Sequence, residues 1–513
     1  RDNLLDPNMP EFSLAMGTSQ IVSGSHSDWA TVGYFSRLNY DYNNIWLLEL
    51  NGRYDGSSSF PANSRWAFFP SASVGYRISE QEFFSPLKTY ISNAKIRASF
   101  GEIGNQAVGA NQYLPVLTSN TVNWLLANGD RAVAYNMPRL VASTLKWERI
   151  QTLDFGGDFG FFNNDLNVSF DWYQRTTLDM LAPGKTMPDA LGASAPLINA
   201  GTLQTRGWEL SLDWRHRFND LMIYANASIG DFKTTVVKWD NDTKLLNTNY
   251  SGKVYGDIWG FETERFFTKD DFNTDGTYKT GVAPQTALDQ RPFVFGPGDV
   301  KFKDLDGNGA IDGGKGTADD HGDLKVIGNF TPRYQYSFRL GGDWKGIDLD
   351  MFFQGVGSRS VWTQSAFVMP MMRGADAIYA NQTDYWTEEN PNPDAEFPRM
   401  YPGNAGRGTI AVLDLGNHNF YPQSKYLVNM AYLRFKNLTV GYTIPVDLSR
   451  KIYMQKARIY FSANNIAEII NASNAPLDPE INTSETGASL GNGTWGRIDP
   501  MFRTVSFGLQ LTF

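Results

Sequence analysis

Hydrophobic and polar residues alternate one by one along the C-terminal segment 505–513. Small or polar residues separate the apolar ones, which are Val505, Phe507, Leu509, Leu511 and Phe513. Successive side chains of a strand point to opposite faces, so this pattern predicts an amphipathic β-strand. In a soluble sheet such a strand would be an exposed edge, whereas a closed barrel pairs it with an earlier strand. The segment therefore favours a transmembrane β-barrel, with the terminal strand of a soluble sheet as the alternative.

The same alternation recurs throughout the chain. In each segment the apolar residues occupy one face, and Asp, Arg, Asn, Ser or Gly residues occupy the other. The segments that we predict as strands on this basis include 34–40, 48–54, 72–78, 96–100, 153–161, 166–172, 208–214, 334–340 and 433–442.

One predicted strand changes phase. Leu433 and Phe435 share a face at odd-numbered positions. The apolar row then continues at even-numbered positions, with Leu438 and Val440. The register therefore slips by one residue near Lys436. A β-bulge at this position would explain the slip, and a misplaced strand boundary is the alternative.

The predicted connections alternate in length. Short turns fall at 41–44, 163–165, 218–220 and 345–346, and long excursions run through 104–144, 179–202, 238–330, 358–430 and 468–499. Outer-membrane barrels have this asymmetry, with short turns on the periplasmic side and long loops outside the cell. We therefore predict an all-β fold, a transmembrane antiparallel β-barrel wall of about thirteen to fourteen strands.

Composition narrows the class of protein further. The 513 residues are 42% hydrophobic and 19% charged, and no apolar run is long enough for a membrane-spanning helix. The net charge of -9 argues against nucleic acid as a partner, and the lack of cysteine excludes disulfides and thiolate metal sites. The 24 Tyr and 14 Trp suit the aromatic girdles of a barrel, but also a soluble secreted β-protein that binds glycans.

Several segments resemble SusC/RagA-type TonB-dependent outer-membrane transporters. They are spread in order over most of the chain, and the poorly matching segments 104–144, 238–298 and 400–420 are those expected to face substrate. The segments that carry the resemblance are Leu50–Ser58, Arg65–Tyr76, Asp299–Gly309, Val326–Asn329, Tyr385–Pro391, Phe397–Arg399, Tyr432–Pro445, Ala457–Asn465 and Arg503–Phe513.

The resemblance implies a 22-stranded barrel that is filled by a plug and preceded by a TonB box. Residues 1–513 would then be the C-terminal portion of the barrel, with the plug and TonB box in another segment. It also implies Gram-negative outer-membrane localisation and TonB-dependent uptake of oligosaccharides or oligopeptides. The implied partners are a SusD-like surface lipoprotein that acts as a lid, the remaining plug and N-terminal barrel segment, and the TonB complex acting through the plug. A plug-less outer-membrane porin is a further alternative.

Residues 304–312 resemble a calcium-binding loop. Oxygen ligands occupy alternate positions, with a glycine at the sixth position, where such loops turn sharply. The twelfth position is Lys315 instead of a bidentate Glu, so the missing carboxylate would come from Asp319, Asp320 or Asp323. We predict a structural Ca²⁺, and the alternative is a Gly-Asn turn with solvated acids. The predicted ligands are Asp304, Asp306, Asn308, the carbonyl of Ala310, and Asp312.

Aromatic residues in the long excursions are candidates for substrate contact. Aromatic faces stack on sugar rings and pack on apolar side chains, although each residue is equally suited to girdle or loop packing. The candidates are Trp362, Tyr379, Tyr385, Trp386 and Trp495, with Trp259 as a further one. Catalytic motifs such as Gly-x-Ser-x-Gly, a P-loop or His-Glu-x-x-His are missing, so we do not expect an enzyme.

Overall fold

The computed structural model describes residues 28–513 apart from 110–111, 118, 127–128, 130, 139, 143–144, 185–187, 189, 191, 193–194, 290–292, 373–375, 402–414, 474 and 481–499. Among the described residues the helices are short, and none has the length and apolar character needed to cross a bilayer. They are η2 (Ile78–Glu80), η3 (Glu82–Leu87), η5 (Lys269–Asp271), η6 (Thr286–Leu288), η7 (Ala380–Gln382), η8 (Leu415–Phe420), α1 (Val446–Ser449) and η9 (Arg450–Ile452).

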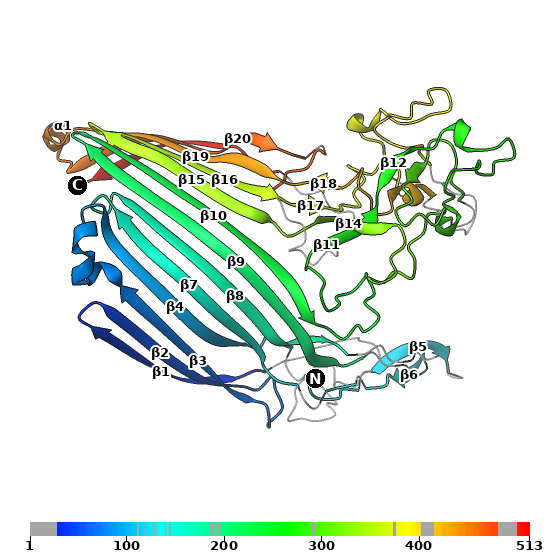
Figure 1. The fold of residues 1–513 in the computed structure, drawn as a ribbon, viewed down its shortest axis with the longest axis horizontal. Coiled ribbons are helices and arrows are strands. Elements are labelled where there is room, and N and C mark those ends of the chain that lie inside the picture. The colour runs from blue at the N-terminus through cyan, green and yellow to red at the C-terminus, as the bar shows by residue number, and fades with distance from the viewer. Residues whose placement is uncertain are drawn as a thin grey trace.

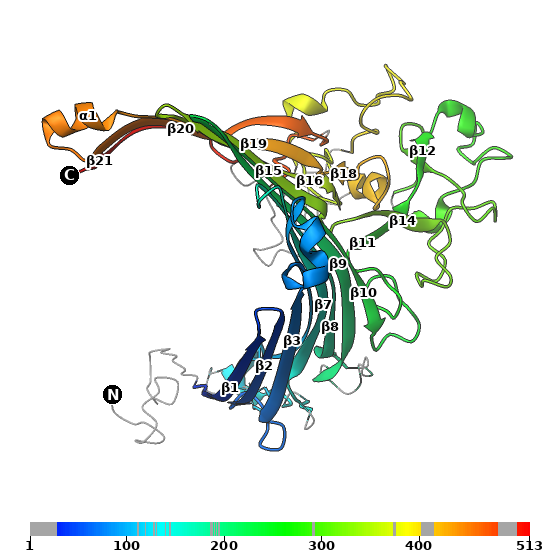
Figure 2. The same cartoon turned by 60° about the vertical axis from the view of Figure 1, so that its left-hand side comes forward.

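In the described part of the chain, one antiparallel sheet of 13 strands dominates, as the alternation predicted. The sheet curves into a wall whose two edges are β1 and β21 (Figure 2). In spatial order the strands are β1 (Thr31–Tyr42), β2 (Trp46–Ser57), β3 (Trp66–Arg77), β4 (Ile91–Asn105), β7 (Glu148–Phe161), β8 (Leu166–Pro183), β9 (Leu197–Phe218), β10 (Leu221–Lys238), β15 (Arg333–Trp344), β16 (Ile347–Ser358), β19 (Tyr432–Thr443), β20 (Lys456–Asn471) and β21 (Thr504–Thr512).

The strand register aligns the apolar positions into continuous rows across the sheet. Phe338 pairs with Phe353, which pairs with Phe435, and the neighbouring ring centroids are 4.5 Å apart in both pairs. The apolar face leaves large side chains uncovered, including Phe507 at 81% exposure and Leu509 at 63%. A face of this kind on a curved sheet suits contact with lipid, because soluble proteins rarely expose such a large apolar surface.

The opposite face is polar and is crossed by ion pairs between strands. The Arg97 guanidinium on β4 donates to Asp171 on β8 at 2.8 Å and to Asp158 on β7 at 3.2 Å. Arg339 on β15 likewise pairs with Asp350 on β16 at 2.6 Å. Charged side chains on this face neutralise one another, as they would on a wall that borders an enclosed polar space.

Connections at the two ends of the sheet differ in length (Figure 1). At one end the strands are joined by links of two to thirteen residues, some with short helices. The long excursions leave from the other end. The predicted excursion 179–202 is shorter than expected, because β8 continues to Pro183 and β9 starts at Leu197. The predicted slip near Lys436 is a β-bulge, since Phe352 pairs with Asn437 and Phe353 with Phe435.

The long excursions after β10 and β16 pack together into one compact unit, which we call the loop body. Small two-stranded pairs organise it: β11 (Asp257–Phe261) with β14 (Leu324–Asn329), β12 (Thr263–Phe266) with β13 (Val300–Phe302), and β17 (Ser360–Val361) with β18 (Val428–Asn429). A separate hairpin, β5 (Ser119–Leu125) with β6 (Arg131–Tyr135), lies in the excursion after β4.

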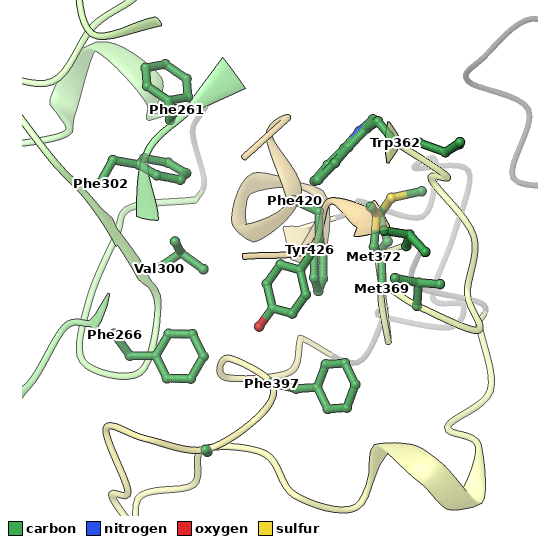
Figure 3. Close-up of a cluster of buried hydrophobic side chains, with 14 of the residues drawn as sticks. Phe261, Phe266, Val300, Phe302, Trp362, Met369, Met372, Phe397, Phe420 and Tyr426 are labelled. Atoms are coloured by element: carbon green, nitrogen blue, oxygen red, sulfur yellow. The ribbon is translucent and has the colours of Figure 1, made fainter. Parts of the chain in front are cut away.

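The largest buried hydrophobic cluster among the described residues lies in the loop body (Figure 3). Phe266, Phe302 and Met430 are at most 1% exposed, and the rings of Phe261 and Phe302 stack with centroids 4.8 Å apart. Burial of several large side chains gives this unit its own hydrophobic stabilisation. The loop body is therefore an ordered structure that holds a fixed shape over one end of the sheet.

Candidate substrate chamber and ion-binding loop

A cavity of about 950 Å³ opens on the polar face of the sheet, at the end from which the long excursions leave. Strand residues from β7 to β10, β15, β16 and β19 form its wall, and Tyr255 and Phe330 from the loop body form part of its cover. The two cover rings meet edge to face, with centroids 5.7 Å apart. We call this cavity the chamber, and its size is at the upper end of the range for small-molecule sites.

The chamber wall combines hydroxyls, amides and aromatic rings. The Thr205 and Thr234 hydroxyls lie 2.8 Å apart on neighbouring strands, and Gln335 and Gln354 contribute side-chain amides. Phe232 projects from the same polar face. Such a wall offers hydrogen bonds in several directions together with a ring for stacking, which suits an oligomeric polar cargo.

Three charged residues line the chamber, namely Arg175, Arg359 and Glu480. Glu480 is compensated, because its carboxylate accepts hydrogen bonds from Arg434 Nη1 and Lys436 Nζ, both at 2.7 Å. Arg359 is 9% exposed and its Nε donates to the carbonyl of Phe330 at 3.2 Å. Arg175 is exposed to the cavity.

The predicted aromatic contact residues lie elsewhere. Trp362 and Trp386 are 6% and 2% exposed. Trp362 belongs to the loop-body core and the Trp386 ring packs over Gly298, so both rings contact the protein itself. Tyr379 stacks on Phe367 at 4.4 Å, and Tyr385 packs against the same core. Trp259 lies beside His321, with ring centroids 5.3 Å apart, and Trp495 falls outside the described residues. Their contact with substrate stays a prediction.

Sequence reasoning missed the aromatic residues of the chamber. Phe232 and Phe352 occupy positions of the polar face, where neighbouring residues of the chamber wall include Ser228, Thr234 and Gln354. An aromatic residue that interrupts a polar row is the signal that would have identified them. Tyr255 and Phe330 carry no comparable signal, because the path of the loop body brings them to the chamber.

The acidic loop brings together two of the predicted ligands and one later carboxylate. Oxygens of Asp304, Asp306 and Asp323 lie within 4.8 Å of one another. Asp323 is completely buried, and its two oxygens accept backbone N–H groups of Leu305 at 2.6 Å and Asp312 at 2.9 Å. Among the three acids proposed to fold back into the loop, Asp323 is the one that does so.

The remaining acids and predicted ligands of this loop have other partners. Asp312 Oδ1 accepts from Gly314 N at 2.7 Å, and Asn308 Oδ1 accepts from Ala310 N at 2.8 Å. Asp320 pairs with Lys315 at 2.9 Å and Asp319 with Lys244 at 2.8 Å. Both oxygens of Asp304 and of Asp306, and Asp323 Oδ2, each accept one hydrogen bond, so each keeps a further lone pair. Hard oxygen donors of this kind fit Ca²⁺.

A buried carboxylate joins separate parts of the loop body. Asp299, at 0% exposure, accepts hydrogen bonds from Tyr401 Oη at 2.8 and 2.9 Å, from Asn419 Nδ2 at 2.7 Å and from Gly296 N at 2.8 Å. Burial raises the pKa of Asp299 to about 6, although these hydrogen bonds and Arg399 act in the opposite direction. The carboxylate is thus a pH-sensitive link between the two long excursions.

Comparison with known proteins identifies the family. Residues 3–466 match the family model described as TonB dependent receptor-like, beta-barrel. TonB-dependent receptor P3 of Formosa agariphila is 27% identical over 94% of this chain, and TonB-dependent receptor SusC of Bacteroides thetaiotaomicron is 26% identical over 94%. These matches cover 45% and 44% of those relatives, so the chain spans about half the length of the curated relatives it matches.

A solved structure shares the fold. The RagAB peptide importer in its open-open state superposes with a TM-score of 0.70 at 22% identity, over 98% of this chain and 49% of that chain. The wall of antiparallel strands, the apolar outer face and the long loops at one end agree with this likeness. The chain belongs to the TonB-dependent receptor β-barrel family and is an outer-membrane protein.

Proposed function

We propose that this chain forms the C-terminal barrel wall and outer loops of a nutrient importer that takes up oligosaccharides or oligopeptides in a TonB-dependent manner. The observation that carries the proposal is the chamber of about 950 Å³ on the polar face, directly under the loop body. A chamber at the outer end of a barrel wall is placed to receive a cargo before it passes inward. The ordered loop body would hold the entrance of the chamber in one conformation.

The proposed partners follow from the same architecture. A plug and further barrel strands, on another segment, would complete the wall at edges β1 and β21 and link it to the TonB complex. A SusD-like surface lipoprotein would close over the loop body. The likeness to the importer called RagAB supports a two-component assembly, and the buried core of the loop body provides a firm surface for a lid.

Uptake measurements test the import function. Cells that produce the intact transporter should accumulate a fluorescently labelled oligosaccharide or oligopeptide library in a saturable manner. Accumulation should stop when TonB is deleted or an uncoupler collapses the proton gradient. Entry that persists without TonB and does not saturate would indicate a passive pore and contradict the proposal.

Co-purification tests the partners. The chain should leave the outer membrane only with detergent, together with a plug-bearing segment and a lipoprotein, which intact-mass analysis would identify. Recovery without a lipoprotein after mild extraction and chemical crosslinking would contradict the lid.

We also propose that the loop of Asp304, Asp306 and Asp323 holds a structural Ca²⁺. Three carboxylate oxygens within 4.8 Å repel one another unless a cation lies between them, and this supports the proposal. Terbium luminescence should reveal binding that Ca²⁺ competes away and that Asp323→Asn abolishes. Equal luminescence for the wild type and this variant would contradict the site.

A further inference from the structure

The Arg175 guanidinium lies in the chamber without a partner. The residue projects from β8 on the polar face and is exposed, and no described residue forms an ion pair or side-chain hydrogen bond with it. Three other arginines of this face are neutralised: Arg97 by Asp171, Arg339 by Asp350 and Arg458 by Asp348. An unpaired cation inside a chamber is a group that is available to bind an anion.

Neither of the other charged residues that line the chamber pairs with Arg175. Glu480, the carboxylate that lines the same chamber, is held by Arg434 and Lys436. The other charged lining residue, Arg359, is a second cation. Two of the three charged residues that line the chamber are therefore cations, although the whole chain has a net charge of -9.

Hydroxyl groups lie on the strands beside the free guanidinium. Thr205 is the cross-strand neighbour of Arg175, and its hydroxyl lies 2.8 Å from that of Thr234 on the next strand. Thr177, two positions along β8, also lines the chamber. Guanidinium and hydroxyl donors together match the oxygens of a carboxylate or sulfate, and arginine presents paired donors in one plane.

We propose that Arg175 binds a carboxylate or sulfate group of the cargo, so that the chamber selects acidic oligomers over neutral ones. This inference rests on the proposed import function. The aromatic rings Phe232 and Phe352 would pack against the uncharged part of the same oligomer, while the hydroxyls of Thr205 and Thr234 complete the oxyanion contacts. An acidic oligosaccharide and an acidic peptide share this chemistry.

Binding to the purified complex tests the inference, with the chain kept together with the polypeptides that complete its barrel. Titration calorimetry would compare trigalacturonate with maltotriose, and triglutamate with trialanine. Arg175→Gln should weaken binding of the acidic probe by roughly 10- to 100-fold, as expected for loss of a charged hydrogen bond, and leave the neutral probe unchanged. Arg175→Lys should restore part of the affinity, because it keeps the charge but loses the planar donors.

A matched control is Arg206→Gln. Arg206 lies next to Thr205 on β9 but on the other face, where its Nε donates to Gln174 at 2.9 Å. This variant removes the same charge outside the chamber and should bind acidic probes as the wild type does. Heat-dependent migration on gels would verify that each variant is folded.

The outcomes separate the alternatives. Binding of trigalacturonate alone or of triglutamate alone supports the inference and identifies the source of the acidic group. Equal affinity for acidic and neutral probes, or acidic binding that Arg175→Gln leaves intact, overturns it. TonB-dependent uptake of a neutral oligomer, unaffected by Arg175→Gln, would overturn the inference while leaving the import function standing. Lack of any TonB-dependent uptake would overturn the import function instead.

Discussion

Protonation of Asp299 is expected to tighten the loop body. The carboxylate is completely buried and links residues 296–299 to Tyr401 and Asn419. Its pKa of about 6 in the folded loop body lies above the 3.8 of an exposed aspartate. We call the loop body open when it is locally unfolded and Asp299 is exposed to water. A raised acid pKa means that the folded loop body holds the proton more firmly than this open state. The free energy of opening therefore rises as pH falls through about 6.

The size of the effect follows from the two pKa values. At pH 7.5 the carboxylate is charged in both states and the proton contributes almost nothing. Near pH 5 the folded loop body is mostly protonated at Asp299 and the open state is not. The difference in opening free energy is about 1.4 kcal/mol, or roughly tenfold less frequent opening. Below pH 4 both states take up the proton and the gain no longer grows.

Hydrogen exchange with mass spectrometry measures this opening. The probe is the peptide that contains Val300, whose amide donates to Asn419 Oδ1 at 2.8 Å. Exchange, corrected for the intrinsic pH dependence, should slow by about tenfold from pH 7.5 to pH 5. Tyr401→Phe removes a donor to the charged form, so the pKa should rise and the transition should move to higher pH.

Asp299→Asn is the reference, because it cannot titrate and shows the contribution of every other group in the same range. The difference in opening free energy between the wild type and this variant should show the predicted dependence on pH. A wild-type profile that is flat, or that shows faster opening at pH 5 than at pH 7.5, would refute the reasoning about the buried carboxylate.

Three further substitutions probe the packing of the two parts of the molecule. Phe302→Ala, at a core position with 1% exposure, should destabilise the loop body by about 3–5 kcal/mol in exchange experiments, while the thermal unfolding of the sheet stays unchanged. Gly508→Val places a side chain where the Tyr460 ring lies, so strand packing should weaken by about 1–3 kcal/mol, measured as a lower urea midpoint of the barrel. Arg265→Ala leaves the carboxylate of Asp271, at 4% exposure, without its bidentate partner and should speed proteolysis of the loop body, with a loss of about 2 kcal/mol. The pKa of Asp271, about 2 with Arg265 in place, should rise in this variant. Unchanged stability in any of the three would contradict the packing assigned to that position.

The sheet was predictable because the interactions that define it act along one strand or between neighbouring strands. Period-two alternation decides which face each side chain takes, and register then follows from pairing like rows, as for Phe338 with Phe353. The bulge at Lys436 was also visible in the sequence. The extra unpaired residue moves the apolar row from odd positions such as Phe435 to even positions such as Leu438. Elements that depend on neighbouring strands only are therefore visible in the sequence.

The candidate site was predictable only in part. Trp362 and Trp386 were chosen because aromatic residues suit substrate contact, but side-chain type does not reveal burial. Trp362 lies in the loop-body core and Trp386 is buried against Gly298, so distant segments cover both rings. The acidic loop was visible from its spacing, whereas the choice of Asp323 depended on a turn that only the folded loop defines. Arg175 was invisible as a free cation, because its lack of a partner depends on the positions of all surrounding carboxylates.

Site-directed labelling of the wall tests the central claim most directly. The chain contains no cysteine, so Phe338→Cys and Ser337→Cys can each carry one bimane label on adjacent residues of β15. In proteoliposomes the label at position 338 should be quenched by brominated lipid, and the label at 337 should instead be quenched by aqueous iodide. Lipid quenching at 337 with iodide quenching at 338, or equal quenching of both, would contradict a barrel wall with an apolar face toward lipid and a polar face toward the import path.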